Sequence, residues 1–219
     1  MGSGSALRVD FEPRRTTAID GPMSAPSPTS RMHTIRFVTG NEGKVAEARE
    51  YLAGLAELEQ VEYDYTEIQS DDLADIATRG AREAYEHLGR SVESEIDGVL
   101  VDDTGLFIDA LGGFPGPYSA YVEGTVGVER VWELARTESD RRAYFRTIMA
   151  YADDSGVETF EGSVGGTLVA PRGTDGFGYD PIFEHNGQTL AEMTYAEKNA
   201  ISHRGRALAT FADWLAERQ

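Results

Sequence analysis

The chain has 219 residues, 40% of them hydrophobic, which is enough for one sizeable domain. It contains no cysteine, which excludes a disulfide framework, a thiolate zinc site and a thiol nucleophile. The formal net charge of −18 disfavours a sequence-independent grip on DNA, RNA or an anionic membrane, because like charges repel.

Residues 1–31 are rich in glycine, serine, proline and threonine and lack hydrophobic periodicity, which is typical of a disordered arm or an upstream extension. Residues 32–219 form the single predicted domain. The N-terminus lacks the apolar core of a secretory signal, and no apolar run approaches the length of about 18 residues that a membrane span needs. We therefore expect a cytoplasmic protein.

Helices and strands are predicted from 34 onward by the spacing of apolar residues. In chain order they are a strand at 35–38, a helix at 45–55, a strand at 61–68, a helix at 73–88, a strand at 99–101, a helix at 127–136, strands at 144–151, 157–160 and 167–169, and a helix at 199–218. Ser70 or Asp71 is the expected cap of the second helix, and Gly89 its stop. Interleaved strands and helices indicate an α/β fold, with a mixed sheet because the later strands follow one another as hairpins.

Residues 39–44, Thr-Gly-Asn-Glu-Gly-Lys, lie where the first strand ends and the first helix begins. Glycines allow a tight turn, and the free N–H groups of a helix N-terminus attract phosphate. Val38 stands where a Walker A loop requires glycine, so the segment is not that motif. The alternative interpretation is a plain helix start capped by Asn41.

Two adjacent carboxylates, Asp102 and Asp103, are expected to close the apolar strand at 99–101, at the sheet edge where α/β proteins place their sites. Their oxygens suit Mg²⁺. Neighbouring side chains on a strand point to opposite faces, so one is expected to face a ligand and the other to brace the turn. Glu67, at the end of another predicted strand, is the natural third carboxylate. The alternative is an Asp-rich turn beside an exposed acid.

Three later segments complete the set of candidate motifs. Residues 111–119 form either a pocket wall or a structural turn, because glycine and proline exclude a helix there. Residues 176–183 could stack Phe177 on a base and hydrogen-bond to it through Asp180, or could be a packed strand entry. Residues 197–205 place cations at the start of the last helix, as a ligand site or as a solvated helix start.

The chain has 38 acidic residues and two lysines, Lys44 and Lys198, both inside these motifs. The acidic excess suggests a solvated surface adapted to high salt. A small anionic ligand could still bind where a divalent ion or local cations neutralise it. A helix start, acids, an aromatic loop and a cation cluster are together what a magnesium nucleotide requires.

Over about 34–215, these segments resemble the Ham1-like family of inosine/xanthosine triphosphate pyrophosphatases. The resemblance implies an elongated mixed β-sheet flanked by helices, two lobes with a central cleft, and a homodimer. It also implies Mg²⁺-dependent hydrolysis of ITP, dITP and XTP to the monophosphate and pyrophosphate, which cleanses the nucleotide pool. The competing hypotheses are a regulatory protein that holds the nucleotide uncleaved and a pyrophosphatase for modified pyrimidines or methylated nucleotides.

The resemblance also implies a role for each site residue. Asp103 and Lys44 would be catalytic, with Asp103 as the proton acceptor, and Glu67, Asp102 and Asp103 would bind metal. The substrate-binding residues would be Thr39, Gly40, Asn41, Glu42, Gly43, Lys44, Thr104, Phe177, Gly178, Tyr179, Asp180, Lys198, His203 and Arg204. Arg204 can donate to a 6-keto oxygen but cannot accept from a 6-amino group, which would favour hypoxanthine or xanthine over adenine.

Overall fold

A computed structural model of the chain describes residues 32–89 and 96–218. The N-terminal arm expected at 1–31 lies outside the described residues, which begin at Met32. No helix in the described part of the chain is long and apolar enough to cross a membrane.

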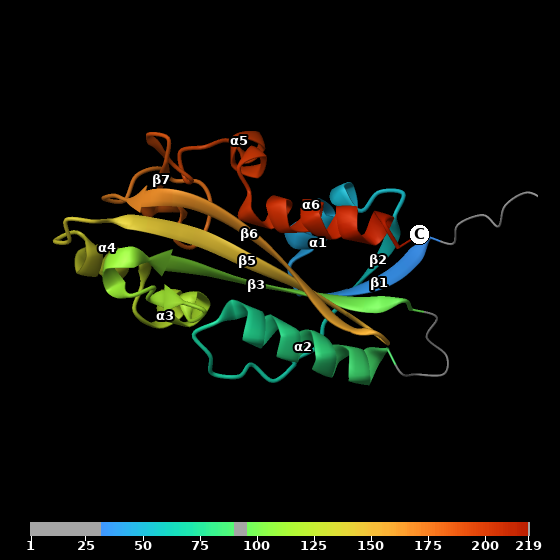
Figure 1. Cartoon of the computed structure of the whole chain (residues 1–219). Helices are drawn as coiled ribbons and strands as arrows, with labels where there is room; N and C mark the ends of the chain where they lie inside the picture. The colour runs from blue at the N-terminus through green and yellow to red at the C-terminus, as the bar shows by residue number, and fades with distance from the viewer. Residues whose placement is uncertain (1–31, 90–95, 219) are drawn as a thin grey trace, which may run out of the picture. The chain divides into compact units, whose positions relative to one another are not determined.

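Within the described residues, eight strands form one sheet in the order β2-β1-β3-β5-β6-β7-β8, with β4 paired to β3 (Figure 1). The strands are β1 His33–Val38, β2 Ala56–Val61, β3 Gly98–Ile108, β4 Pro115–Gly116, β5 Arg142–Asp153, β6 Gly156–Leu168, β7 Phe183–His185 and β8 Gln188–Thr189. β1 runs parallel to β2 and β3, whereas the other pairs are antiparallel. The predicted α/β class with a mixed sheet is confirmed.

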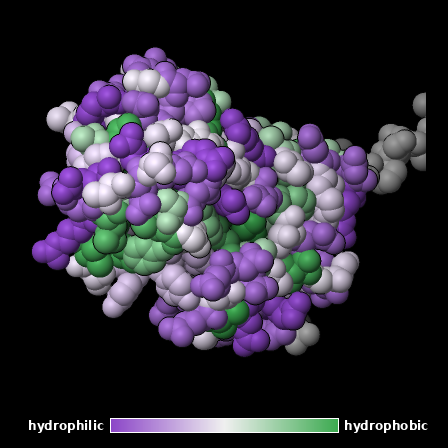
Figure 2. All heavy atoms as spheres, turned by 60° about the vertical axis from the view of Figure 1, so that its left-hand side comes forward, coloured by the Kyte–Doolittle hydropathy of each residue, from purple (hydrophilic) through white to green (hydrophobic). Residues whose placement is uncertain are grey.

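Helices cover both faces of this sheet. They are α1 Glu42–Tyr51, α2 Leu73–Leu88, α3 Ser119–Thr125, α4 Val128–Ala135, α5 Tyr195–Ala200 and α6 His203–Ala216. Figure 1 shows α1 and α6 on one face and α2 on the other. In the view of Figure 2, polar side chains cover most of the surface, and apolar side chains gather in a band between two polar regions.

The alternation of side chains along β3 divides the core. Leu100 packs with β1, α1 and α6, whereas Val99 and Val101 pack with α2. Farther along, Leu106 joins a third cluster with Phe145 and residues of α3 and α4. Successive strand residues point to opposite faces, so each face of β3 contributes to a different packed layer and, as described below, to a different part of the site.

The strand expected at 61–68 is wrong. The strand is β2, Ala56–Val61, and residues 62–70 have no regular structure. β2 was missed because it is an edge strand with only Leu58 buried, so it lacks the expected apolar alternation. Residues 61–68 have the apolar pattern of a strand because Tyr63 and Tyr65 pack against the α2 cluster, although they have no β partner. Glu67 therefore lies in an irregular segment rather than at a strand end.

Other boundaries also differ from expectation. Asp102 and Asp103 do not close a strand, because β3 pairs with β5 as far as Ile108. The second helix is capped by Asp72, not by Ser70 or Asp71. The last helix is interrupted, and α6 starts afresh at the N-cap Ser202, whose side chain accepts from the Gly205 N–H. Gly89 ends α2 as predicted.

Candidate active site

Two cavities adjoin at the middle of β3. The first, of about 630 Å³, contains the cationic side chains and is called here the cationic cavity; its polar lining includes Lys44, Glu47, Lys198, His203 and Arg204. The second, of about 730 Å³, is the acidic cavity, lined by Glu62, Asp64, Glu67, Asp102 and Asp103 among others. Lys44, Thr104 and Ala120 line both cavities. Each cavity has the size of a small-molecule site.

The helix start at 39–44 brings Lys44 to this junction. Asn41 is the N-cap of α1, and its side chain accepts from the N–H groups of Gly43 at 2.9 Å and Lys44 at 3.3 Å. Gly40 and Gly43 are not among the glycines with positive φ, so the turn does not need glycine in the way expected. Glu42 is exposed and lines neither cavity. The motif is therefore a capped helix start that also positions a lysine.

Asp102 lies on the α1 and α6 face of β3, where two cations contact it. The Nζ of Lys44 is 2.9 Å from Oδ1 and 2.8 Å from Oδ2, and the Nε of Arg204 is 3.5 Å from Oδ2. Arg204 also donates from Nη1 to Glu47 at 3.0 Å, and Ser202 donates to the same carboxylate. Two buried acids thus hold Arg204 and Lys44 beside the cavity, a compensated arrangement for charges removed from water.

Asp103 lies on the opposite face of β3, toward α2. Burial first, and then the nearby Asp102 and Glu67 carboxylates, raise the pKa of its carboxyl to about 7. The Lys44 charge and a hydrogen bond with the Tyr65 hydroxyl act in the opposite direction. The Oδ2 atom is buried and has no hydrogen-bond partner in the described residues. A carboxyl with a pKa near neutrality and a free oxygen can take up a proton.

His203, the first residue of α6, presents a neutral ring to the cationic cavity. Burial lowers its pKa to about 3, with the Arg204 charge as the second cause. Its Nδ1 lies 2.6 Å from Oγ1 of Thr147, and its ring stacks on Phe145 with centroids 5.3 Å apart. A neutral ring can offer a ligand hydrogen bonds but no charge.

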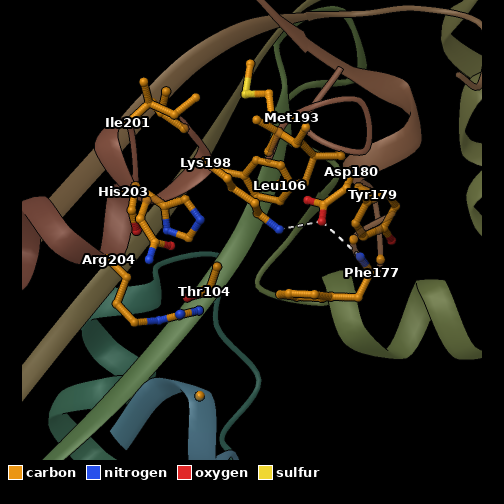
Figure 3. Close-up of a pocket in the computed structure, with 18 of the residues that line it drawn as sticks. Thr104, Leu106, Phe177, Tyr179, Asp180, Met193, Lys198, Ile201, His203 and Arg204 are labelled. Atoms are coloured by element: carbon orange, nitrogen blue, oxygen red, sulfur yellow. Dashed lines mark hydrogen bonds and ion pairs between the residues drawn. The ribbon is translucent and has the colours of Figure 1, made fainter. Parts of the chain in front are cut away.

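A loop closes the other side of the cationic cavity (Figure 3). The carboxylate of Asp180 accepts from Lys198 Nζ and, at 2.9 Å, from the Phe177 N–H. The Nζ of Lys198 lies 4.3 Å from the centroid of the Phe177 ring, which is 69% exposed. Tyr179 anchors the loop by donating to the Ser119 carbonyl at 2.8 Å. The loop thus presents an accessible aromatic face next to a cation.

The structure brings the remaining predicted site residues to the two cavities, with Glu42 as the exception. Asn41, Gly43, Thr104, Phe177, Gly178, Tyr179, Asp180, Lys198, His203 and Arg204 line the cationic cavity; Thr39, Gly40, Glu67, Asp102 and Asp103 line the acidic one.

Sequence reasoning missed three residues of the site: Glu47, Tyr65 and Thr147. Glu47 carries a signal, since it is a charged residue beside Val45 and Ala48 on the buried face of α1. Thr147 carries a weaker one, as a polar residue within an apolar strand.

The fit to a metal ion can be judged from the carboxylates. Among residues 32–89 and 96–218, no group of three or more His, Cys, Asp or Glu side chains is arranged to hold a metal. Asp102 is already paired with Lys44 and Arg204. Asp103, with its free Oδ2, and the neighbouring Glu67 remain, and Mg²⁺ is commonly held by one or two carboxylates plus phosphate oxygens. The residues fit Mg²⁺ that arrives with a phosphorylated ligand.

The fold and the joined cavities define an α/β protein suited to a small phosphorylated ligand with a flat ring. The chain belongs to the Ham1 family, which it matches over residues 35–214. It is 46% identical over 188 residues to the dITP/XTP pyrophosphatase of Thermococcus kodakarensis, covering 84% of this chain and 97% of the relative. The enzyme of the same name from Methanopyrus kandleri is 47% identical over 185 residues, covering 82% and 95%.

Solved structures agree with this assignment. The HAM1 protein from Coxiella burnetii superposes with a TM-score of 0.75 at 33% sequence identity, covering 85% of this chain and 100% of that one. The fold expected from the sequence motifs is thus the fold of the family.

Proposed function

We propose that this protein hydrolyses the abnormal purine nucleoside triphosphates dITP, ITP and XTP to the nucleoside monophosphate and pyrophosphate, and so cleanses the nucleotide pool. The observation that carries the proposal is the junction of a cationic, aromatic-walled cavity with an acidic one at Lys44 and Thr104. Relatives named for this activity, at 46% and 47% identity over most of the chain, support it.

In this proposal the purine base lies in the cationic cavity. Phe177 offers a stacking face, and base–aromatic stacking contributes about 1–3 kcal/mol per base. Arg204, held by Glu47 and Asp102, has a buried Nε without a hydrogen-bond partner in the described residues. Guanidinium donors match the 6-keto oxygen of hypoxanthine or xanthine and cannot accept from the amino group of adenine. A site whose donors stay unpaired with the wrong base discriminates strongly.

The triphosphate extends from that cavity toward the start of α1. The Lys44 side chain and the positive end of the α1 dipole would bind it, because a lysine and a helix N-terminus both attract phosphate. Asp103 would orient the attacking water and take its proton as the bond between the α- and β-phosphates breaks. Its buried Oδ2, which has no hydrogen-bond partner in the described residues, supports this role.

For the metal, we propose Glu67 and Asp103 as the protein ligands of Mg²⁺. When bound, Mg²⁺ would neutralise phosphate charge in an otherwise acidic cavity. Asp102 then has a different role from the one its position in the motif suggested: it positions Lys44 and Arg204, with which it forms ion pairs.

The test is a substrate panel. Pyrophosphate release is measured for ITP, dITP, XTP, ATP and GTP, with Mg²⁺ and with chelator. We expect release from the first three, at least about 100-fold above ATP in kcat/KM, and none in chelator. Equal rates with ATP would remove the proposed selectivity. Nucleotide binding without pyrophosphate release would favour a regulatory protein, and faster release from methylated or pyrimidine analogues would favour the related pyrophosphatase class.

Three further expectations from the sequence stay proposals: a homodimer, a cytoplasmic location and adaptation to high salt. The net charge of −18 supports the last, since self-repulsion at low ionic strength destabilises a compact state. Sedimentation in low and high salt measures the assembly, and a salt titration of unfolding measures the adaptation. A protein equally stable in both conditions contradicts the salt proposal.

A further inference from the structure

The hydroxyl of Thr147 is buried between two side chains of the site. Thr147 is fully buried on β5 and lies directly opposite Thr104 of β3 in the sheet register. The two Oγ1 atoms are 2.6 Å apart, and the Thr147 Oγ1 is also 2.6 Å from Nδ1 of His203. Thr104 lines both cavities, and His203 lines the cationic one. A hydrogen-bonded chain therefore runs from the junction of the cavities, through a buried hydroxyl, to the ring that faces the base.

Gly162, the residue of β6 that pairs with Thr147, explains how His203 can contact Thr147. Thr147 pairs with Gly162 of β6, and a Cβ at Gly162 would lie 1.9 Å from the His203 carbonyl oxygen. Glycine at this position lets the first turn of α6 lie directly on the sheet. Stacking on Phe145, with ring planes 20° apart, holds the imidazole plane. Phe145 and Gly162 together place Nδ1 of His203 within hydrogen-bonding distance of the Thr147 hydroxyl.

The number of available protons allows two arrangements of the hydrogen bonds between Thr104, Thr147 and His203. A hydroxyl carries one proton, and a neutral imidazole carries one N–H. In the first arrangement Thr104 donates to Thr147, Thr147 donates to Nδ1 of His203, and Nε2–H is free to donate into the cavity. In the second every bond is reversed, so that Nδ1–H donates to Thr147, Thr147 donates to Thr104, and Nε2 can only accept.

The proposed substrate distinguishes the two arrangements, because a 6-keto oxygen can accept a hydrogen bond from the ring only when Nε2 is protonated. In the first, each atom of the chain has a partner, and Nε2–H faces the cavity shown in Figure 3.

We propose that Thr147 is a specificity-determining positioning residue, which places the proton on Nε2 of His203 and so makes this ring a donor to a base oxygen. The inference rests on the proposed function and deepens it. Nε2–H and the Arg204 guanidinium together match the two lone pairs of one 6-keto oxygen. A 6-amino group meets two donors and can satisfy neither. Thr147 itself touches no base and acts through His203.

The experiment compares Thr147→Val, which is isosteric and lacks the hydroxyl, with Thr147→Ser, which keeps it. The control is Thr159→Val, the same change at an exposed position of β6. For each variant, kcat/KM is measured for dITP and dATP, and folding is checked by thermal unfolding. We expect Thr147→Val to lower the dITP to dATP ratio by about 3- to 10-fold, the equivalent of one hydrogen bond, and the other two variants to keep it.

A second readout needs no turnover. Long-range proton–nitrogen correlation spectra of the imidazoles, with inosine monophosphate added, report which ring nitrogen is protonated. The chain has four histidines, and His203→Gln assigns the signal. We expect Nε2 protonated and Nδ1 bare in the wild type.

Several outcomes overturn the inference. An unchanged ratio in Thr147→Val does so, as does an equal fall in Thr147→Ser, which would indicate packing and not the hydroxyl. A protonated Nδ1 in the wild type also overturns it. If the wild type releases no pyrophosphate from either nucleotide, the proposed function fails, and the spectrum still decides the position of the proton.

Discussion

Two neighbouring carboxylates on β3 have opposite environments. Asp102 is 7% exposed and contacts Lys44 and Arg204 on the α1 and α6 face. Asp103, one residue later, is turned toward α2, the Tyr65 hydroxyl and Glu67, and its pKa is raised to about 7 by burial and by the neighbouring acids. One strand therefore separates a charge-compensated acid from an acid whose pKa lies near neutrality, by the alternation of its side chains.

The difference teaches how an acidic protein can bind an anionic substrate. The cations are on one face of the sheet, held by Asp102 and Glu47, and the carboxylates suited to a metal are on the other. The two sets meet where Lys44, Thr104 and Ala120 line both cavities. In the proposed binding mode, a triphosphate that crosses this junction would meet donors for its base and, at its other end, the carboxylates proposed to hold Mg²⁺.

The largest expected effect comes from making the same substitution at both acids. Asp103→Asn should lower turnover by about 10²- to 10⁴-fold, because the proton acceptor is lost. It should also stabilise the metal-free protein at pH 8 by about 2 kcal/mol. The folded pKa of about 7 lies above the usual 3.8, so the ionised carboxylate destabilises the fold as pH rises through that interval.

Asp102→Asn is the matched control and should change stability in the opposite direction. It leaves Lys44 and Arg204 without their shared counter-ion, which should destabilise the protein by about 2 kcal/mol. Chemical denaturation in chelator measures the change in the free energy of unfolding for both variants. If both substitutions change stability in the same direction, the two faces of β3 do not differ in the way described. If Asp103→Asn turns over substrate at the wild-type rate, Asp103 has no catalytic role.

The next effect concerns the neutral ring of His203. The pKa of His203 in the folded protein, about 3, lies below the usual 6.5. Between these two pH values the imidazole is protonated in the unfolded chain and neutral in the folded protein. Stability should therefore fall as pH drops from 7 to 5, by about 2 kcal/mol from this group. Denaturation curves at both pH values, for wild type and His203→Gln, isolate the contribution. The same loss in both proteins would show that His203 does not cause it.

The smallest predicted effect sharpens the role of the cationic face. Arg204→Ala should reduce the preference for ITP over ATP, in kcat/KM, by about 10-fold, since one donor to the 6-keto oxygen is removed. Glu47 and Asp102 then lose a partner, so the variant's melting temperature must be measured alongside. An unchanged ITP to ATP ratio in a folded variant would exclude Arg204 from base selection.

Much of the site could be predicted from sequence because its motifs are local. The cap at Asn41, the carboxylate pair and the aromatic loop each occupy a few consecutive residues, and short-range chemistry specifies them. The alternation of strand residues even implied that the two acids face opposite ways. What failed depended on partners: β2 is an edge strand with little apolar signal, and β3 is long because β5 pairs along it.

By itself, then, the sequence determined the α/β class, the order of the motifs and the residue types that could bind a nucleotide. Tertiary structure decided which acid pairs with Lys44 and Arg204, and that Thr147 lies between Thr104 and His203. The physical reason is how far apart in the sequence the interacting residues lie. Caps and periodicity act between residues a few positions apart, whereas Thr104, Thr147 and His203 meet only after β3, β5 and α6 have packed together.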